Sequence, residues 1–174
     1  DVYKRQVPNV VAYDTAYAYE VAAIVRSGLK RMYEEHEDVL FYLTVGNENY
    51  AHPEMPEGAE AGILRGMYRL REAAESEAKR RVQLLGSGSL LNEVVEAADL
   101  LADKFEVQAD VWSVTSYQQL HRDAVSVERR NRLNPEKEAH EPYIVRCLAD
   151  APGPIIACSD SVSYTHLTLP TTGV

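Results

Sequence analysis

Apolar and polar positions along this chain follow the periods of strands and helices in turn, and their order predicts an α/β protein. Short apolar runs rich in β-branched or aromatic residues indicate buried strands, whereas apolar residues three or four positions apart indicate helices with one buried face. The predicted strands are Val10–Tyr13, Val39–Val45, Val82–Leu85, Val111–Ser116 and Ile155–Ser159. The predicted helices are a segment that ends in the acidic stretch Glu34–Asp38, and then Ala59–Leu70, Leu90–Phe105, His121–Asn131 and Tyr143–Leu148. Alternation of this kind favours a layered α/β architecture.

The first strand, helix and second strand have the lengths of a βαβ unit, in which the two strands run parallel. Asp14 or Thr15 is expected to accept hydrogen bonds from the free amides at the helix start. The buried face of the helix is expected at five apolar positions: Val21, Ile24, Val25, Leu29 and Met32. Tyr13, Tyr17 and Tyr19 cluster where the helix begins, which suits a core edge or a subunit contact more than catalysis.

A polar, charged stretch at Glu72–Arg81 interrupts the pattern and predicts a linker between two domains. We therefore expect one domain over residues 7–50 and a second over residues 80–160. Residues 51–79 are expected to form a loop, a helix and the linker.

Composition excludes several classes of partner. The net charge of −9 argues against nucleic acid and against an anionic membrane, because both require a basic face. Cys147 and Cys158 form no Cys-x-x-Cys pair, which favours a reducing compartment and offers no zinc spacing. No apolar stretch is long enough to span a bilayer and no signal peptide begins the chain, so we expect a cytoplasmic protein.

Candidate chemistry is concentrated in the loop after the second strand, at the sheet edge where α/β proteins usually bind ligands. This loop gathers a carboxylate, two amides, a phenol and an imidazole in Asn47, Glu48, Asn49, Tyr50 and His52. The loop is expected either to line an active-site entrance or, as the favoured alternative, to brace a domain or subunit interface through hydrogen bonds. The remaining histidines lack partner ligands at metal spacing and are expected at the surface: His36, His121 and His140.

A glycine-rich turn at Gly86–Ser89 joins a predicted strand to a predicted helix. Such a turn can approach a phosphate group with its free amides. The third glycine of a dinucleotide fingerprint is replaced by Leu91, and no lysine follows to make a P-loop. A structural turn in which Ser89 caps the helix is therefore favoured over a phosphate site.

The two ends of the chain predict adapter translation rather than natural protein. Asp1–Gln6 back-translates as GAT GTG TAT AAG AGA CAG, which is a transposase end sequence used to prepare sequencing libraries. Val162–Leu167 back-translates as its reverse complement. We therefore expect residues 1–6 and 161–174 to carry no function.

Several long runs resemble the homodimeric, thiamine-diphosphate-dependent pyruvate dehydrogenase family, in the family's order and spacing. They are VPNVVAYDTAYAYEVAAIVRSGLKRMY, LTVGNENYAHPEMPEGAEAGILRGMYRL, VQLLGSGSLLNEVVEAADLL, ADVWSVTSYQQLHRDA and ERRNRLNP. The resemblance implies the end of a pyrimidine-binding domain followed by a truncated transketolase C-terminal-type domain. It also implies a homodimeric parent enzyme that uses thiamine diphosphate and Mg²⁺ to decarboxylate pyruvate and passes the acetyl group to a lipoyl acetyltransferase.

The family's catalytic glutamate, its Gly-Asp-Gly motif and its substrate histidines do not match any position of this sequence, so no catalytic, cofactor-binding or metal-binding residue is carried over. The chain is therefore expected to be an inactive fragment. Two alternatives remain open at this point. The parent is another thiamine-dependent 2-oxo acid dehydrogenase or a transketolase, or the chain is a non-catalytic α/β interaction module.

Overall fold

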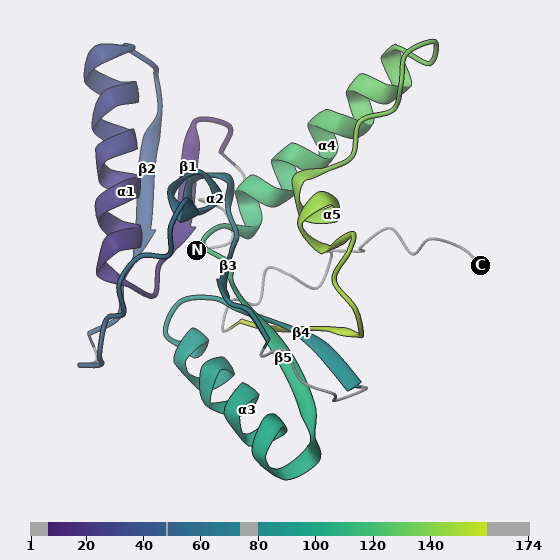
Figure 1. Ribbon diagram of the computed structural model, residues 1–174. Helices are drawn as coiled ribbons and strands as arrows, with labels where there is room; N and C mark the ends of the chain where they lie inside the picture. Colours follow the sequence, from purple (N-terminus) through teal and green to yellow (C-terminus); the bar gives the residue numbers. More distant parts are fainter. Residues whose placement is uncertain (1–6, 48, 74–79, 160–174) are drawn as a thin grey trace.

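The computed structural model describes residues 7–47, 49–73 and 80–159, which form two α/β units that meet along a seam (Figure 1). In the first unit, β1 (Val10–Asp14) and β2 (Leu40–Thr44) pair in parallel. Helix α1 (Ala18–Leu29), continued by a π-helical turn at Lys30–Glu34, connects the two strands. The predicted βαβ unit is confirmed.

The buried face of α1 is narrower than the apolar pattern predicts. Ala23 and Ile24 are buried against Val11 and Tyr13 of β1. Val25 and Leu29 are 45% and 50% exposed, so the prediction that they lie on the buried face was wrong. They lie four residues apart on a stripe of the helix that stays about half-exposed.

The second unit is a four-stranded mixed sheet in the order β3-β5-β4-β6. Strand β4 (Arg80–Gly86) runs parallel to both β5 (Val107–Ser113) and β6 (Ile155–Cys158). Strand β3 (Tyr68–Arg71) is antiparallel to β5. The α/β fold class is thereby confirmed.

Helices cover both faces of this sheet, as Figure 1 shows. Helix α3 (Leu90–Phe105) lies below it and buries Leu91, Val94 and Ala98. Helices α4 (Tyr117–Leu133) and α5 (Tyr143–Leu148) lie on the other face, where Trp112 packs with residues of both helices. Successive strand residues face opposite sides, so β4 and β5 contribute alternate side chains to the two cores.

The predicted helix Ala59–Leu70 was wrong in its second half. Helix α2 covers only Ala59–Arg65, and Tyr68–Arg71 forms β3 instead. Gly66 ends the helix with φ +108°, and an added Cβ there would lie 2.5 Å from the carbonyl oxygen of Ser116. The helical spacing continues past this point in the sequence, but pairing with β5 overrides it.

Three other boundaries moved. Arg80 and Arg81, predicted as the end of a linker, begin β4, whereas residues 74–79 of that linker lie outside the described residues. Strand β5 begins at Val107, four residues before the predicted strand. Helix α4 begins at Tyr117 rather than His121. The first shift follows from the ladder between β4 and β5, which pairs Arg80 with Val107 and Gly86 with Ser113. The second follows from a cap, because the side chain of Ser116 accepts a hydrogen bond from the amide of Gln119.

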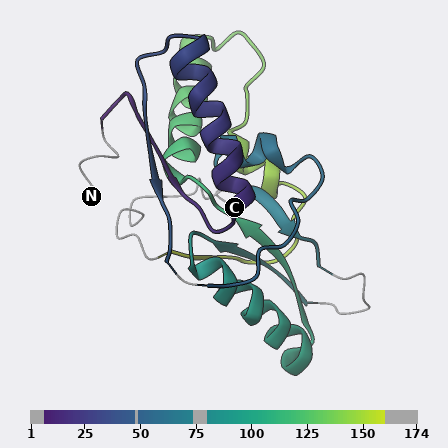
Figure 2. The same ribbon diagram turned by 90° about the vertical axis from the view of Figure 1, so that its left-hand side faces the viewer.

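Residues at the start of α4 join the two units along the free edge of β1. The amide of Asp14 donates to the carbonyl of Thr115 at 2.7 Å, and the amide of Ala12 donates to the side chain of Gln118 at 2.8 Å. The hydroxyl of Ser116 donates back to the carbonyl of Ala12 at 2.6 Å. The view turned by 90° shows the same arrangement, with α1 in the upper unit and α3 at the lower end of the molecule (Figure 2). The seam therefore fixes how the two units lie relative to each other.

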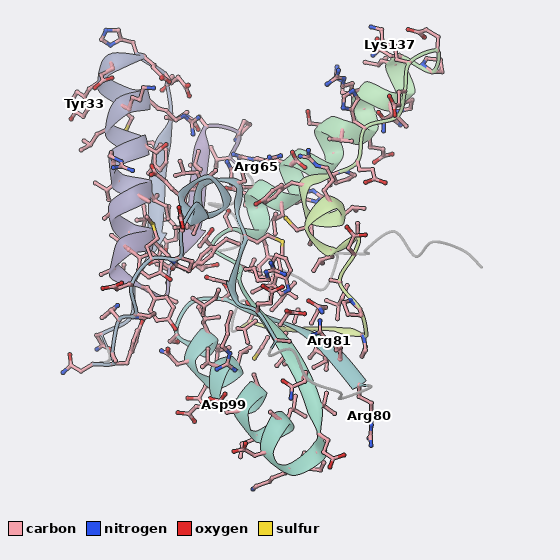
Figure 3. The ribbon with its side chains drawn as sticks, viewed as in Figure 1. Tyr33, Arg65, Arg80, Arg81, Asp99 and Lys137 are labelled. Atoms are coloured by element: carbon pink, nitrogen blue, oxygen red, sulfur yellow. The ribbon has the colours of Figure 1, made fainter. Side chains whose placement is uncertain are left out.

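The far end of α4 projects from the body as an arm, with Lys137 at its tip (Figure 3). Asn131 holds the returning chain by two hydrogen bonds to the backbone of His140. The arginines of this helix end are solvent-exposed: Arg129, Arg130 and Arg132.

No helix in the described ranges is long and apolar enough to cross a membrane. The adapter hypothesis concerns residues 1–6 and 161–174, which lie outside the described residues.

Candidate functional site

The start of α1 is organised by a buried carboxylate. Glu20, with no exposed surface, accepts hydrogen bonds from the amides of Ala16 and Tyr17 through one oxygen, at 2.6 and 3.1 Å. The expectation that Asp14 or Thr15 caps the helix was therefore wrong. Thr15 instead donates its hydroxyl to the carbonyl of Thr44, the last residue of β2.

The second oxygen of Glu20 reaches across the seam. It accepts the hydroxyl of Tyr68 from β3 and the hydroxyl of Ser113 from β5, both at 2.7 Å. Tyr68 also lies 2.6 Å from the hydroxyl of Tyr19. Burial and the nearby Glu20 carboxylate raise the pKa of Tyr68 far above its usual value, so this phenol stays protonated as a donor. Glu20 thus ties the two units together.

The candidate loop folds back onto this helix start through Tyr50 and His52. The hydroxyl of Tyr50 donates to the carbonyl of Ala16, and Nδ1 of His52 accepts the amide of Ala18 at 3.1 Å. The two rings lie 5.0 Å apart between centroids, and Tyr17 packs edge-on against both. Because Nδ1 accepts, the ring proton of His52 lies on Nε2.

The two asparagines of the loop lie at the surface, outside this cluster. Asn47 and Asn49 are exposed, and Glu48 lies outside the described residues. Tyr17 donates its hydroxyl to Asn92 of α3 at 3.2 Å. Burial and the neighbouring Glu20 raise the pKa of Tyr17, which keeps this phenol protonated. The cluster of Tyr17, Tyr50 and His52 is therefore a braced, hydrogen-bonded corner with one imidazole near the surface.

The corner offers no site for a metal. Among the residues that the structure describes, no group of three or more His, Cys, Asp or Glu side chains is placed to hold an ion. The isolated histidines His36, His121 and His140 are exposed, as expected. Both cysteines are free thiols, and burial raises the pKa of Cys147.

The glycine-rich turn Gly86–Ser89 links β4 to α3 as predicted, with Ser89 at the expected cap position. Ser89 is the N-cap residue, yet its side chain accepts no hydrogen bond from the helix. Gly86 is required by close packing, because an added Cβ would lie 2.9 Å from Cα of Leu91. Gly88 has φ +58° and open space where a Cβ would be.

Sequence reasoning missed Glu20, Tyr68 and Ser113. Glu20 is the third residue of α1, a position where a glutamate often bonds back to the amides before the helix. That local signal could have found its role at the helix start. Its partners Tyr68 and Ser113 are 48 and 93 residues away, so no spacing rule reveals them.

Two family models match separate stretches of the chain. Residues 1–53 match the pyruvate dehydrogenase E1 component middle domain, and residues 66–169 match the transketolase-like TK C-terminal domain. The first range includes residues 1–6, and the second includes part of residues 161–174, which we expect to be adapter translation. That expectation stays a prediction.

Individual relatives carry the name pyruvate dehydrogenase E1 component. The Pseudomonas aeruginosa relative is 51% identical over 154 residues, which cover 88% of this chain and 17% of the relative. The Escherichia coli K12 relative is 52% identical over 147 residues, covering 84% of this chain and 16% of the relative. The chain thus spans about one sixth of the length of these relatives.

Solved structures agree with the fold. A transketolase variant from Pichia stipitis superposes with a TM-score of 0.55 at 18% identity, covering 90% of this chain and 19% of that chain. The same enzyme in complex with sedoheptulose 7-phosphate gives a TM-score of 0.52 at 17% identity, covering 89% of this chain and 19% of that chain. This chain belongs to the transketolase-like C-terminal domain family, and most of its length is homologous to pyruvate dehydrogenase E1 components.

Proposed function

We propose that the parent of this chain is a thiamine-diphosphate- and Mg²⁺-dependent enzyme that decarboxylates pyruvate and passes the acetyl group to a lipoyl acetyltransferase. The observation that supports it is 51% identity over 154 residues to a pyruvate dehydrogenase E1 component, continuous through both units. The proposal includes a homodimeric parent in the cytoplasm, a compartment with which two free thiols are consistent.

The described residues do not fit the cofactor. Glu20 is the carboxylate in the seam, but it has no exposed surface and already accepts four hydrogen bonds. No metal-binding group of side chains occurs in the described ranges, and the sequence has no Gly-Asp-Gly motif. We therefore derive no catalytic step from these residues and assign cofactor binding to other parts of the parent.

For this segment we propose a structural role in the parent. Residues 7–50 would be the end of a pyrimidine-binding domain and residues 80–160 the beginning of a C-terminal domain, with residues 51–79 between them. The hydrogen bonds of Glu20 to Tyr68 and Ser113 support a fixed angle between the two domains. The bonds of Tyr50 and His52 to the start of α1 support a bracing role for the Asn47–His52 loop.

The test compares this chain with the full-length gene recovered by extending the sequence on both sides. Each protein is assayed for pyruvate-dependent acetylation of a lipoyl domain and titrated calorimetrically with thiamine diphosphate and Mg²⁺. We expect turnover and binding for the full-length protein and neither for the chain. Cofactor binding by the chain alone would overturn its assignment as an inactive segment.

Substrate choice separates the alternatives. Turnover of 2-oxoglutarate or of a ketose phosphate in place of pyruvate would identify another 2-oxo acid dehydrogenase or a transketolase. A full-length protein without a thiamine-dependent activity would instead support the other alternative, a non-catalytic α/β interaction module.

A further inference from the structure

A cavity at the seam carries more positive than negative side chains. It has a volume of about 430 Å³ and lies where β1, α2 and the first half of α4 meet (Figure 1). Three guanidinium groups and one carboxylate line it: Arg31, Arg65, Arg122 and Asp123. The chain as a whole carries a net charge of −9, so this cavity runs against the charge of the molecule. A hollow lined mainly by one sign of charge concentrates ions of the opposite sign.

Two of the three guanidinium groups already have carboxylate partners. Nε and Nη2 of Arg31 donate to one oxygen of Glu37, at 2.8 and 2.6 Å. Arg65 of α2 reaches toward α4, where it lies 3.8 Å from Asp123 (Figure 3). The same guanidinium group stacks on the ring of Tyr143, 3.9 Å from its centroid. These two charges are therefore largely satisfied within the chain.

Arg122 is the charge that is left over. It is partly buried and donates to the carbonyl of Val7 at 3.0 Å, and it pairs with no carboxylate in the ranges 7–47, 49–73 and 80–159. Burial and the neighbouring Arg31 lower the pKa of Arg122, because both destabilise its positive charge. A charge taken partly out of water is costly unless it is paired. An anion in the cavity would supply that pair.

Apolar side chains form much of the remaining wall of the cavity. They come from β1, from α2 and from the residues just before β1 and β2: Val11, Leu64, Pro8 and Val39. The volume is near the lower end of the range for small-molecule sites. An organic acid can place its carboxylate at Arg122 and its hydrocarbon against this wall, which removes apolar surface from water. The lining therefore favours a carboxylate with a short aliphatic body over a bare inorganic anion.

We propose that this seam cavity binds a small aliphatic carboxylic acid, with its carboxylate paired to Arg122 and its hydrocarbon against Val39 and Leu64. The ligand contacts elements of both units, so its binding stabilises the folded chain. The dissociation constant is on the order of 1 mM, because one charge pair near the surface and a short hydrocarbon contribute little free energy. Binding requires none of the thiamine chemistry proposed for the parent.

Titration of the ¹⁵N-labelled chain with isovalerate at constant ionic strength tests this site. The amide signals of Val39, Leu64 and Arg122 should shift and saturate. Arg122→Gln should weaken the affinity at least about tenfold, because it removes a hydrogen bond between two charged groups. Arg129→Gln, at an exposed arginine of α4 outside the cavity, is the matched control and should bind as the unchanged chain does. Isovalerate should also raise the melting temperature of the chain and of the control, but not that of Arg122→Gln.

Two further anions test the place of the hydrocarbon. Acetate should bind at least about fivefold more weakly than isovalerate, because each buried methylene contributes about fourfold. Inorganic phosphate should also bind more weakly than isovalerate, since it has no apolar body. Equal binding of acetate and isovalerate, or tighter binding of phosphate, would overturn the assignment of an aliphatic acid.

Three other results would overturn the proposal. Absence of saturable shifts up to about 20 mM isovalerate, well beyond a millimolar dissociation constant, would show that the cavity binds no such acid. Unchanged affinity in Arg122→Gln would place the ligand elsewhere. Loss of binding in the full-length parent, titrated in the same way, would show that other residues of the parent fill the cavity.

Discussion

Replacement of Glu20 is expected to loosen the seam between the two units, by an amount that depends on which donors lose their acceptor. In Glu20→Ala the amides of Ala16 and Tyr17 lose their only acceptor, and backbone amides cannot reverse their role. Each buried donor left unsatisfied costs about 1 to 3 kcal/mol. The hydroxyls of Tyr68 and Ser113 can turn to other acceptors, such as Tyr19. We therefore expect a loss of about 4 kcal/mol in the free energy of unfolding.

Glu20→Gln should cost much less, about 1 to 2 kcal/mol. The amide oxygen can accept from the two backbone amides, while the NH₂ group donates to the hydroxyls of Tyr68 and Ser113. What is lost is the charge assistance of the carboxylate. Glu20→Ala is therefore expected to lose much more free energy of unfolding than Glu20→Gln, because of the chemistry of the four donors.

Urea unfolding followed by the fluorescence of Trp112, the single tryptophan, measures both variants. Glu60→Gln is the control, because Glu60 is 43% exposed by side chain and pairs with Arg26 at the surface. Such a pair contributes about 0.5 kcal/mol or less. The reasoning is refuted if the free energy of unfolding of Glu20→Ala lies within about 1 kcal/mol of that of the control variant. It is also refuted if Glu20→Gln lowers the free energy of unfolding as much as Glu20→Ala does.

Three further outcomes are expected. Gly66→Ala should destabilise the chain by about 2 kcal/mol or more in the same assay, whereas Gly46→Ala, where a Cβ meets nothing, should be nearly neutral; equal effects would contradict the role of Gly66. Tyr68 has a raised folded pKa, so its stabilising contribution is complete below the ordinary tyrosine value of 10.0 and falls as pH rises above it. Tyr68→Phe should flatten that alkaline loss, measured as melting temperature against pH, and an unchanged slope would count against it. Tyr50→Phe removes the donor to Ala16 and should cost about 1 kcal/mol; hydrogen exchange at the start of α1 should quicken, and an unaltered rate would argue against bracing.

Local pattern predicted most elements, but it placed the ends of several of them wrongly. Helix α3 was predicted to the residue, because its apolar face and the glycine turn before it are both local signals. Strand β3 was missed because Ile63, Met67 and Leu70 continue a helical spacing. Only the ladder to β5 and the left-handed turn at Gly66 convert those residues to a strand. Boundaries failed wherever a distant partner decided them.

Among the candidate residues, the sequence placed Tyr50 and His52 in a loop after a strand, and their bonds to the start of α1 came from the fold. The Gly86–Ser89 turn was located correctly, whereas the burial of its Ser87 hydroxyl without a hydrogen-bond partner among the described residues is visible only in three dimensions. Hydrogen-bond satisfaction depends on groups brought together from different elements, which periodicity does not encode.

The sequence by itself determined the class of fold, most of its elements apart from β3, and the family, because periodicity and long matched runs are properties of the chain alone. Tertiary structure decided where helix gave way to strand at Gly66 and which polar groups meet at the seam. Glu20, Tyr68 and Ser113 lie far apart in sequence, and a buried carboxylate is stable only where folding supplies all of its donors at once.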